Sequence, residues 1–146
     1  MIYWLTGQPG SGKTTLAKWL EAHFAGKAAI VDGDDIREIF DNKDYSESGR
    51  RKNIDLAQKI SRFYHHKGNI AIVALVSPYK DQRDSFKIEM GDNMKEIYIH
   101  TTDIRGREQY HVAEYNPPIE NFVDIDTTNK PEFETFQELR QKLNLI

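Results

Sequence analysis

Residues 7–14 read Gly-Gln-Pro-Gly-Ser-Gly-Lys-Thr, and this short segment constrains the fold more than any other part of the chain. Its glycines permit backbone conformations and close approaches that other residues resist, so several N–H groups can point at one anion. A helix that begins at Lys13 would add its N-terminal amides and dipole. The spacing matches the phosphate-binding loop of nucleotide-binding proteins at every required position. A plain glycine-rich turn before a helix is the alternative interpretation. A chance match in so short a chain occurs on the order of once in a few hundred sequences.

The residues of this loop have separate expected roles. Lys13 is expected to bridge the β- and γ-phosphates of ATP and to act in catalysis, and Thr14 is expected to ligate magnesium. ATP and Mg²⁺ are therefore the predicted cofactors. The residues expected to contact the nucleotide here are Gly7, Gly10, Ser11, Gly12, Lys13, Thr14 and Thr15.

Apolar segments alternate with helical patterns along the whole chain, which predicts a mainly parallel sheet covered on both faces. Residues 70–76 are apolar on both faces, as expected for a central strand. We expect strands at 2–5, 28–31, 70–76, 96–100 and 122–126, and helices at 13–24, 36–40, 49–67, 80–90 and 132–143. The predicted fold class is α/β, a three-layer P-loop NTPase fold with about five strands. Residues 1–146 are expected to form one kinase domain, with a lid-like segment at about 104–121 that contains the irregular stretch Glu108–Asn121.

Composition narrows the classes of function. The chain has 146 residues, a formal net charge of −3 and no cysteine. The charge argues against a nucleic-acid-binding protein. The lack of cysteine excludes disulfides and thiolate metal sites and fits a reducing cytoplasm, which is the expected location. No leader-like segment precedes the first strand and no apolar run approaches about 20 residues, so neither secretion nor a membrane partner is expected. Self-association as a homodimer is left open.

Polar clusters follow three of the predicted strands, where ligands of parallel sheets bind. They are Gly7–Thr14, Asp32–Asp34 and Ser77–Lys80. Phosphoryl transfer to a hydroxyl group needs magnesium near the β- and γ-phosphates and a carboxylate that receives or orients the hydroxyl proton. Asp32 is the candidate metal ligand and Asp34 the candidate base. An acidic turn that only caps the next helix is the alternative, and Asp35 is assigned to that role.

Four motifs in the same order carry a family resemblance. They are the loop Gly7–Thr15, Asp32-Gly33-Asp34-Asp35-Ile36-Arg37, Tyr45-Ser46 with Arg50 and Asn53-Ile54, and Val76-Ser77-Pro78-Tyr79-Lys80 with Arg83. Over roughly the first 100 residues the chain resembles adenylylsulfate kinase, the family that phosphorylates the ribose 3′-hydroxyl of adenosine 5′-phosphosulfate.

The resemblance implies an acceptor site. Arg37, Arg50 and Asn53 would hold the phosphate or sulfate end of the acceptor, and Tyr45 would stack on its base. Ser77 would hydrogen-bond the acceptor, and Asp34 would receive the hydroxyl proton. Arginine suits bidentate oxyanion recognition and an aromatic ring suits a base, which agrees with these roles. The alternatives are a solvated helix face for Arg50 and Arg51 and a core position for Tyr45.

The chain departs from the family pattern in three places. Gln8 and Pro9 stand where the family loop has leucine and serine. Asp55 and Leu56 stand where the family has two arginines, and the later family segments KGLYxxA and FTGID are missing. The corresponding stretch is shorter. Arg105 and Arg107 are candidate lid arginines that neutralise the transferring phosphoryl group or pack on adenine; an exposed arginine pair is the alternative. Tyr110, His111 and Tyr115 are weaker candidates for acceptor contacts.

The predicted function is ATP-dependent transfer of the γ-phosphoryl group to a hydroxyl group of a small nucleotide-like acceptor, with adenylylsulfate as the first candidate. The altered lid favours a kinase on the same scaffold with another acceptor, such as cytidine diphosphoramidate. A nucleotide-binding regulatory ATPase is the alternative of another class. A nucleic-acid end kinase is disfavoured by the acidic balance.

Overall fold

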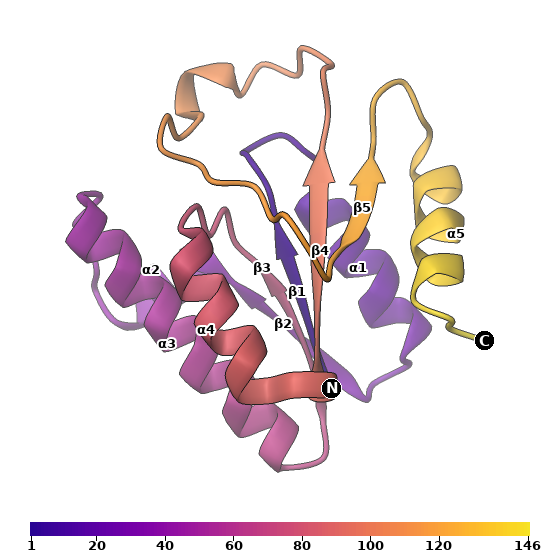
Figure 1. The fold of residues 1–146 in the computed structure, drawn as a ribbon, viewed down its shortest axis with the longest axis horizontal. Helices are drawn as coiled ribbons and strands as arrows, with labels where there is room; N and C mark the ends of the chain where they lie inside the picture. Colours follow the sequence, from indigo (N-terminus) through magenta and orange to yellow (C-terminus); the bar gives the residue numbers. More distant parts are fainter.

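The strand β1, Ile2–Thr6, lies at the centre of a five-stranded sheet in the computed structural model, which describes residues 1–146 (Figure 1). The other strands are β2 (Ala28–Asp32), β3 (Ile70–Ala74), β4 (Met94–His100) and β5 (Val123–Asp126). The strand order is β2-β3-β1-β4-β5, and every neighbouring pair is parallel. The α/β class, the parallel sheet and the helices on both faces are thus confirmed.

Successive side chains of β1 enter opposite hydrophobic cores, because side chains alternate across a strand. Ile2 and Trp4 pack on one face and Tyr3 and Leu5 on the other. The first face is covered by α3 (Glu47–His66) and α4 (Lys80–Met90), and the second by α1 (Lys13–His23) and α5 (Glu132–Lys142) (Figure 1). Neither face of this strand contacts water, which explains why its sequence is continuously apolar instead of alternating between apolar and polar residues.

Four element boundaries differ from the sequence prediction by two residues or more, and local hydrogen bonds explain two of them. The helix α2, Gly33–Ile39, begins directly after β2 because the Asp32 carboxylate accepts the N–H of Asp34 at 2.8 Å. The capping carboxylate is thus Asp32, and not Asp35 as expected. The helix α3 begins at Glu47 because the Ser46 hydroxyl accepts the N–H of Gly49. The strand β3 ends at Ala74, two residues before the predicted end, and β4 begins at Met94, two residues before the predicted start.

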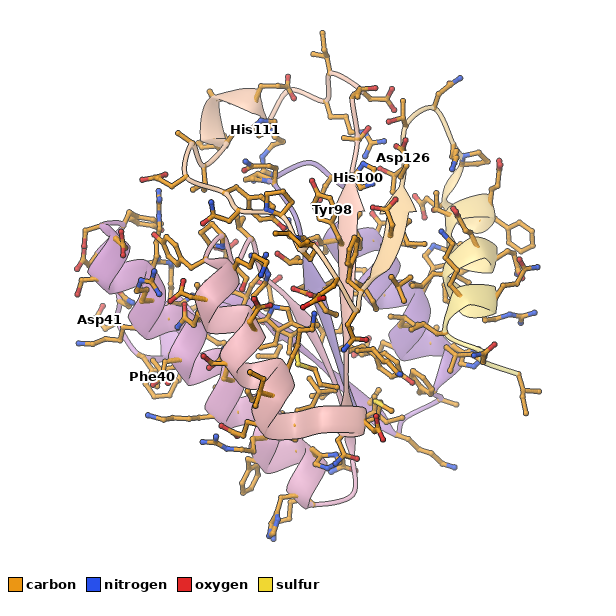
Figure 2. The ribbon with its side chains drawn as sticks, in the orientation of Figure 1. Phe40, Asp41, Tyr98, His100, His111 and Asp126 are labelled. Carbon is orange, nitrogen blue, oxygen red and sulfur yellow. The ribbon has the colours of Figure 1, made fainter.

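The connection from β4 to β5 passes over the carboxyl edge of the sheet (Figure 1). We call residues 104–121 of this connection the lid segment. Its regular structure is one 3₁₀ turn, Glu108–Tyr110. Figure 2 shows His111 on this segment, beyond the ends of the strands, and Tyr98 and His100 on β4 below it. The phosphate loop follows β1, with the earlier strands β2 and β3 on one side of it and the later strands β4 and β5 on the other. Loop and lid segment therefore meet at the usual ligand crevice of such folds. No helix of the chain has the length and apolar character needed to cross a membrane.

A buried ion cluster joins α4 to β4. The Arg83 and Glu96 side chains are fully buried and 2.7 Å apart, and the Lys87 ammonium group contacts the other Glu96 oxygen at 2.7 Å. Arg83 also donates to the carbonyl oxygens of Ser77 and Asn116. One guanidinium group therefore ties the β3–α4 loop and the end of the lid segment to the sheet.

We predict that Glu96→Ala lowers the free energy of unfolding by about 3–5 kcal/mol, because it leaves two cations without their buried partner. Urea denaturation measures this change. Glu89→Ala is the matched control: it removes an exposed ion pair with Arg62 and is expected to cost less than about 1 kcal/mol. Equal losses for the two variants would contradict the importance of the buried cluster.

Candidate active site

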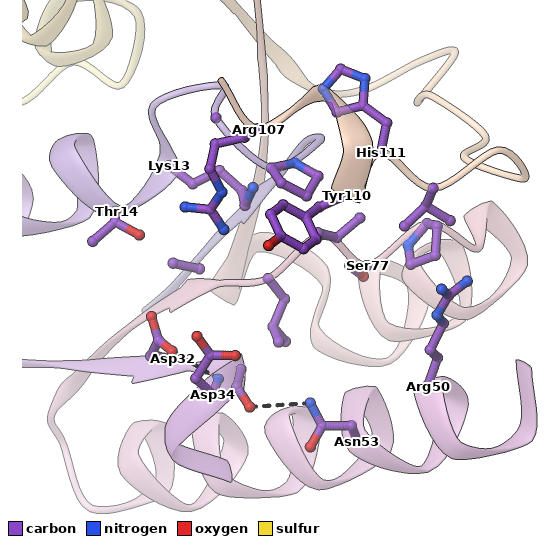
Figure 3. Close-up of a pocket in the computed structure, with 18 of the residues that line it drawn as sticks. Lys13, Thr14, Asp32, Asp34, Arg50, Asn53, Ser77, Arg107, Tyr110 and His111 are labelled. Atoms are coloured by element: carbon purple, nitrogen blue, oxygen red, sulfur yellow. Dashed lines mark hydrogen bonds between the residues drawn. The ribbon is translucent and has the colours of Figure 1, made fainter. Parts of the chain in front are cut away.

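A cavity of about 780 Å³ opens at the carboxyl ends of the strands, and both the phosphate loop and the acceptor motifs line it. Figure 3 shows Lys13, Thr14 and Arg107 toward one end and Arg50 toward the other, with Tyr110 between them. The predicted site residues that line it are Gly10, Gly12, Lys13, Thr14, Thr15, Asp32, Asp34, Arg37, Tyr45, Arg50, Asn53, Ser77, Arg105 and Arg107. Of the predicted set, Gly7 and Ser11 lie outside the lining. Both are buried parts of the loop behind it.

The phosphate loop has the backbone that an anion cradle needs. Gly10 and Gly12 have φ angles of +83° and +109°, which side chains other than glycine rarely tolerate. A Cβ atom on Gly10 would also approach the Arg107 Cβ to 3.1 Å. Gly12 is the N-cap of α1, so the first amides of that helix face the cavity. The loop can therefore present N–H groups and a helix dipole to a polyphosphate.

Lys13 supplies the buried cation of this loop. Its ammonium group donates to the carbonyl oxygens of Gly7 at 2.8 Å and of Gln8 at 2.9 Å. Burial, and after it the nearby Arg107, lowers the pKa of Lys13 to about 8, while Asp32 acts in the opposite direction. A bound polyphosphate would favour the charged form of Lys13, because opposite charges raise the pKa of an ammonium group.

Asp32, Asp34 and Thr14 offer oxygen atoms to the same space. The carboxylates of Asp32 and Asp34 extend from the start of α2 toward the cavity (Figure 3). One Asp32 oxygen caps α2, which leaves the other for a ligand. No group of three or more His, Asp or Glu side chains forms a ready-made metal site in the chain. Mg²⁺ usually binds through one or two protein oxygens together with substrate phosphates and water, so this donor set fits that ion.

Arg37, Tyr45 and Arg50 form the far wall of the cavity, and they are held differently. The Arg37 guanidinium group donates to the carbonyl oxygens of Asn42 and Asp44 and lies 4.0 Å from the centre of the Tyr45 ring. Tyr45 is 63% exposed, so the core position considered for it is wrong. The side chain of Arg50 has one charged neighbour, Glu114 of the lid segment, at 3.8 Å. Arg50 therefore has more of its N–H donors available to a ligand than Arg37 has.

Asn53 and Ser77 are buried at the base of the cavity. The Asn53 amide donates to the Gly33 carbonyl at 3.3 Å, and its buried carbonyl oxygen has no partner in the protein. Buried polar atoms normally have a partner, so this oxygen suits a donor group on a ligand. The Ser77 hydroxyl accepts a hydrogen bond from the Trp4 indole, and Ser77 has φ of +48°.

The two lid arginines have different environments. Arg105 donates to the carbonyl oxygens of Gly10, Ser11 and Thr127 and to the Asp103 carboxylate. Four of its five N–H donors are thus used inside the protein. The guanidinium group of Arg107 has no such bonds and lies 5.4 Å from the centre of the Tyr110 ring. Arg107 is therefore the cation that is free to meet a phosphoryl group, whereas Arg105 braces the loop.

Sequence reasoning missed three groups that shape this site. Gln8 bonds to the lid segment, Glu108 accepts the N–H groups of Arg105, Gly106 and Arg107, and Thr127 donates to the Ser11 carbonyl at 2.7 Å. These backbone bonds hold the pKa of Glu108 below its usual value. Each is a contact of a polar side chain with a main-chain group, and the spacing of residues in a motif does not predict such contacts. Gln8 alone gave a signal, as a departure from the family loop.

Comparisons with known proteins agree on one family. The family model described as "Adenylylsulphate kinase" matches residues 1–128. An adenylyl-sulfate kinase of Clostridium kluyveri is 27% identical over 135 residues, which cover 87% of this chain and 68% of that protein. A cytidine diphosphoramidate kinase of Campylobacter jejuni is 33% identical over 142 residues, which cover 90% of this chain and 81% of that protein.

A solved structure shows the same fold. The Mycobacterium tuberculosis APS kinase CysC, in complex with AMPPNP and APS, superposes with a TM-score of 0.81 at 21% identity. The alignment covers 98% of this chain and 96% of that one. Some of the sequence relatives are longer: an adenylyl-sulfate kinase of Buchnera aphidicola is aligned over 52% of its length.

We predict that burial of Lys13 makes the stability of the nucleotide-free protein depend on pH. Between pH 8 and about 10.5, Lys13 is already neutral in the folded protein but still charged in the unfolded chain. The unfolded state then binds more protons, so stability rises with pH through this window. Relative to Lys13→Met, the wild type should gain up to about 3 kcal/mol in free energy of unfolding from pH 7.5 to 10.5. Urea denaturation at each pH measures this difference, and a constant difference would contradict the low pKa.

Proposed function

Because this chain belongs to the adenylylsulphate kinase family, we propose that it transfers the γ-phosphoryl group of ATP to a hydroxyl group of a nucleotide-like acceptor, with the 3′-hydroxyl of adenylylsulfate as the first candidate. The family acts as a phosphotransferase, and the relatives named above include adenylyl-sulfate kinase.

One observation carries the proposal: a single cavity is lined at one end by the phosphate loop and at the other by the acceptor motifs. Direct transfer needs donor and acceptor side by side in one site, since positioning supplies most of the catalysis of phosphoryl transfer. A regulatory ATPase has no need of the second end. The presence of Arg37, Tyr45, Arg50 and Asn53 along that end therefore favours a kinase.

The residues of the cavity divide the work of the proposed reaction. The amides of the phosphate loop and Lys13 hold the β- and γ-phosphates, and Arg107 neutralises the charge that spreads over the transferring group. Asp34 orients the acceptor hydroxyl and receives its proton. Thr14 and Asp32 would hold Mg²⁺, which supplies further charge neutralisation when it is bound. We propose the cytoplasm as the location of this reaction, which the absence of cysteine fits.

The guanidinium groups of Arg37 and Arg50 favour an acceptor with an anionic end, and the Tyr45 ring favours an acceptor with a planar base. Adenylylsulfate has both features, and so does a cytidine diphosphate derivative. The second candidate is supported by a specific finding: the alignment to the cytidine diphosphoramidate kinase has 33% identity and covers 81% of that protein, against 27% identity and 68% for the adenylyl-sulfate kinase of Clostridium kluyveri. We keep cytidine diphosphoramidate as the alternative acceptor.

A coupled assay of ADP release across adenylylsulfate, cytidine diphosphoramidate and related nucleotides tests the proposal. We expect acceptor-dependent ADP release, with mass spectrometry showing one added phosphoryl group on the acceptor. Activity with cytidine compounds alone would transfer the assignment to the alternative. ATP hydrolysis that no acceptor stimulates would contradict the kinase itself.

We predict that Asp34→Asn lowers turnover by about a hundredfold or more and changes the affinity for ATP little, because the amide cannot receive the hydroxyl proton. Steady-state kinetics and nucleotide titration measure the two effects. Asp35→Asn is the matched control, one residue along the same turn and outside the cavity lining. Near-full turnover of Asp34→Asn would show that another group accepts the proton.

A further inference from the structure

Gln8 lies in the phosphate loop and pairs with the backbone of the lid segment. Its side-chain nitrogen donates to the Val112 carbonyl oxygen at 2.8 Å, and its side-chain oxygen accepts the Val112 N–H at 2.8 Å. Only a side-chain amide offers a donor and an acceptor at the spacing of a peptide group, so it pairs with one residue much as a neighbouring strand would. Leucine, the residue at this position of the family loop, can make neither bond.

This pairing is the main polar attachment of the middle of the lid segment. Between Gly106 and Glu114, the two bonds to Gln8 are the only hydrogen bonds to residues outside the lid segment. The other polar contact of this stretch is the Glu114–Arg50 pair at 3.8 Å. On either side of residues 106–114 the segment has further hydrogen bonds to the core. Arg105 donates to the Gly10 carbonyl on one side, and on the other the Tyr115 hydroxyl group bonds to Thr6 at 2.7 Å.

The stretch between these anchors carries the residues that face the transfer site. Arg107, Tyr110 and His111 line the cavity, and Val112 itself is buried against it. Gln8 also contacts the buried cation, because its main-chain carbonyl oxygen accepts a hydrogen bond from the Lys13 ammonium group at 2.9 Å. One residue therefore links the phosphate loop to the part of the lid segment that covers it.

We propose that Gln8 is a positioning residue: its paired bonds to Val112 hold the lid segment closed over the phosphate loop, place Arg107 at the transferring group and keep water out. The inference rests on the proposed kinase function for its catalytic consequence, but the closure is a property of the protein alone. Without the pair, the segment opens more often, and water competes with the acceptor for the phosphoryl group.

The test compares the wild type with Gln8→Leu and Gln8→Glu. Hydrogen exchange, followed by mass spectrometry or NMR, measures closure in the absence of any reaction. We expect amides 106–112 of Gln8→Leu to exchange about tenfold faster than in the wild type, since two hydrogen bonds are lost. Gln8→Glu keeps an acceptor for the Val112 N–H and loses the donor, so its exchange rates should lie between the two.

The catalytic arm measures the phosphorylated acceptor formed for each ADP released, with the best acceptor of the assay above. Gln8→Leu should lose about tenfold in kcat and release several times more ADP without product, with the KM for ATP changed less. Gln58→Leu is the matched control, because it removes a glutamine bond to the Gln82 backbone between α3 and α4, away from the cavity. A purely structural loss would lower Tm in both variants and leave the product-to-ADP ratio unchanged.

The outcomes separate the two proposals. Wild-type exchange of amides 106–112 in Gln8→Leu, or an unchanged product-to-ADP ratio despite faster exchange, would overturn the role of Gln8. The same holds if Gln8→Glu matches the wild type in both measurements. Absence of transfer to every acceptor by the wild type would overturn the proposed function, while the exchange rates would still decide whether Gln8 holds the segment closed.

Discussion

A buried ammonium group held by two carbonyl oxygens of its own loop is the interaction on which the site depends. Lys13 can occupy this place only if the end of β1 and the start of α1 stay fixed relative to each other, because its partners are the carbonyl oxygens of Gly7 and Gln8. The two hydrophobic cores supply that rigidity, since β1 is buried on both faces and α1 packs on one of them. The cost of burying the charge appears as the lowered pKa of Lys13. A polyphosphate in the cavity would replace part of the solvation that the ammonium group has lost.

The sequence was sufficient for the fold because local and global signals agree along most of the chain. The apolar strands, the spacing of Leu16 and Leu20 on α1, and the glycine-rich loop all lead to the same parallel sheet. Boundaries were predicted less well where a side chain takes over a backbone bond. Asp32 and Ser46 start helices earlier than periodicity suggested, because each caps the N–H groups of the next turn. The residues of the phosphate loop were predictable for a physical reason, since an anion cradle tolerates few alternatives to glycine, lysine and threonine at fixed spacing.

The rest of the site depends on contacts between distant parts of the chain, which spacing does not encode. The sequence presented Arg105 and Arg107 as an equivalent pair, two residues apart. The structure separates them, because Arg105 uses its donors on the loop and on Thr127 while Arg107 keeps its own free. The sequence offers Arg83 only as the last residue of a family motif, yet it is fully buried against Glu96 and holds the loop at Ser77. Such partners become visible only when the fold has placed them together.

The lid segment is attached to the rest of the protein mainly by polar contacts. Val112 and Pro118 are the only buried residues between 104 and 121, so apolar burial contributes little to docking this segment. Hydrogen bonds of polar side chains take that role, to backbone groups for Arg105 and Gln8 and between hydroxyl groups for Tyr115 and Thr6. Each is individually weak and directional. A segment attached in this way can open for substrate entry at low cost, yet it returns to one defined position, because a displaced donor or acceptor finds no equivalent partner nearby. Apolar docking would permit sliding. The polar attachment through Arg105, Gln8 and Tyr115 therefore suits a segment that must both move and place a charged side chain accurately over the phosphate loop.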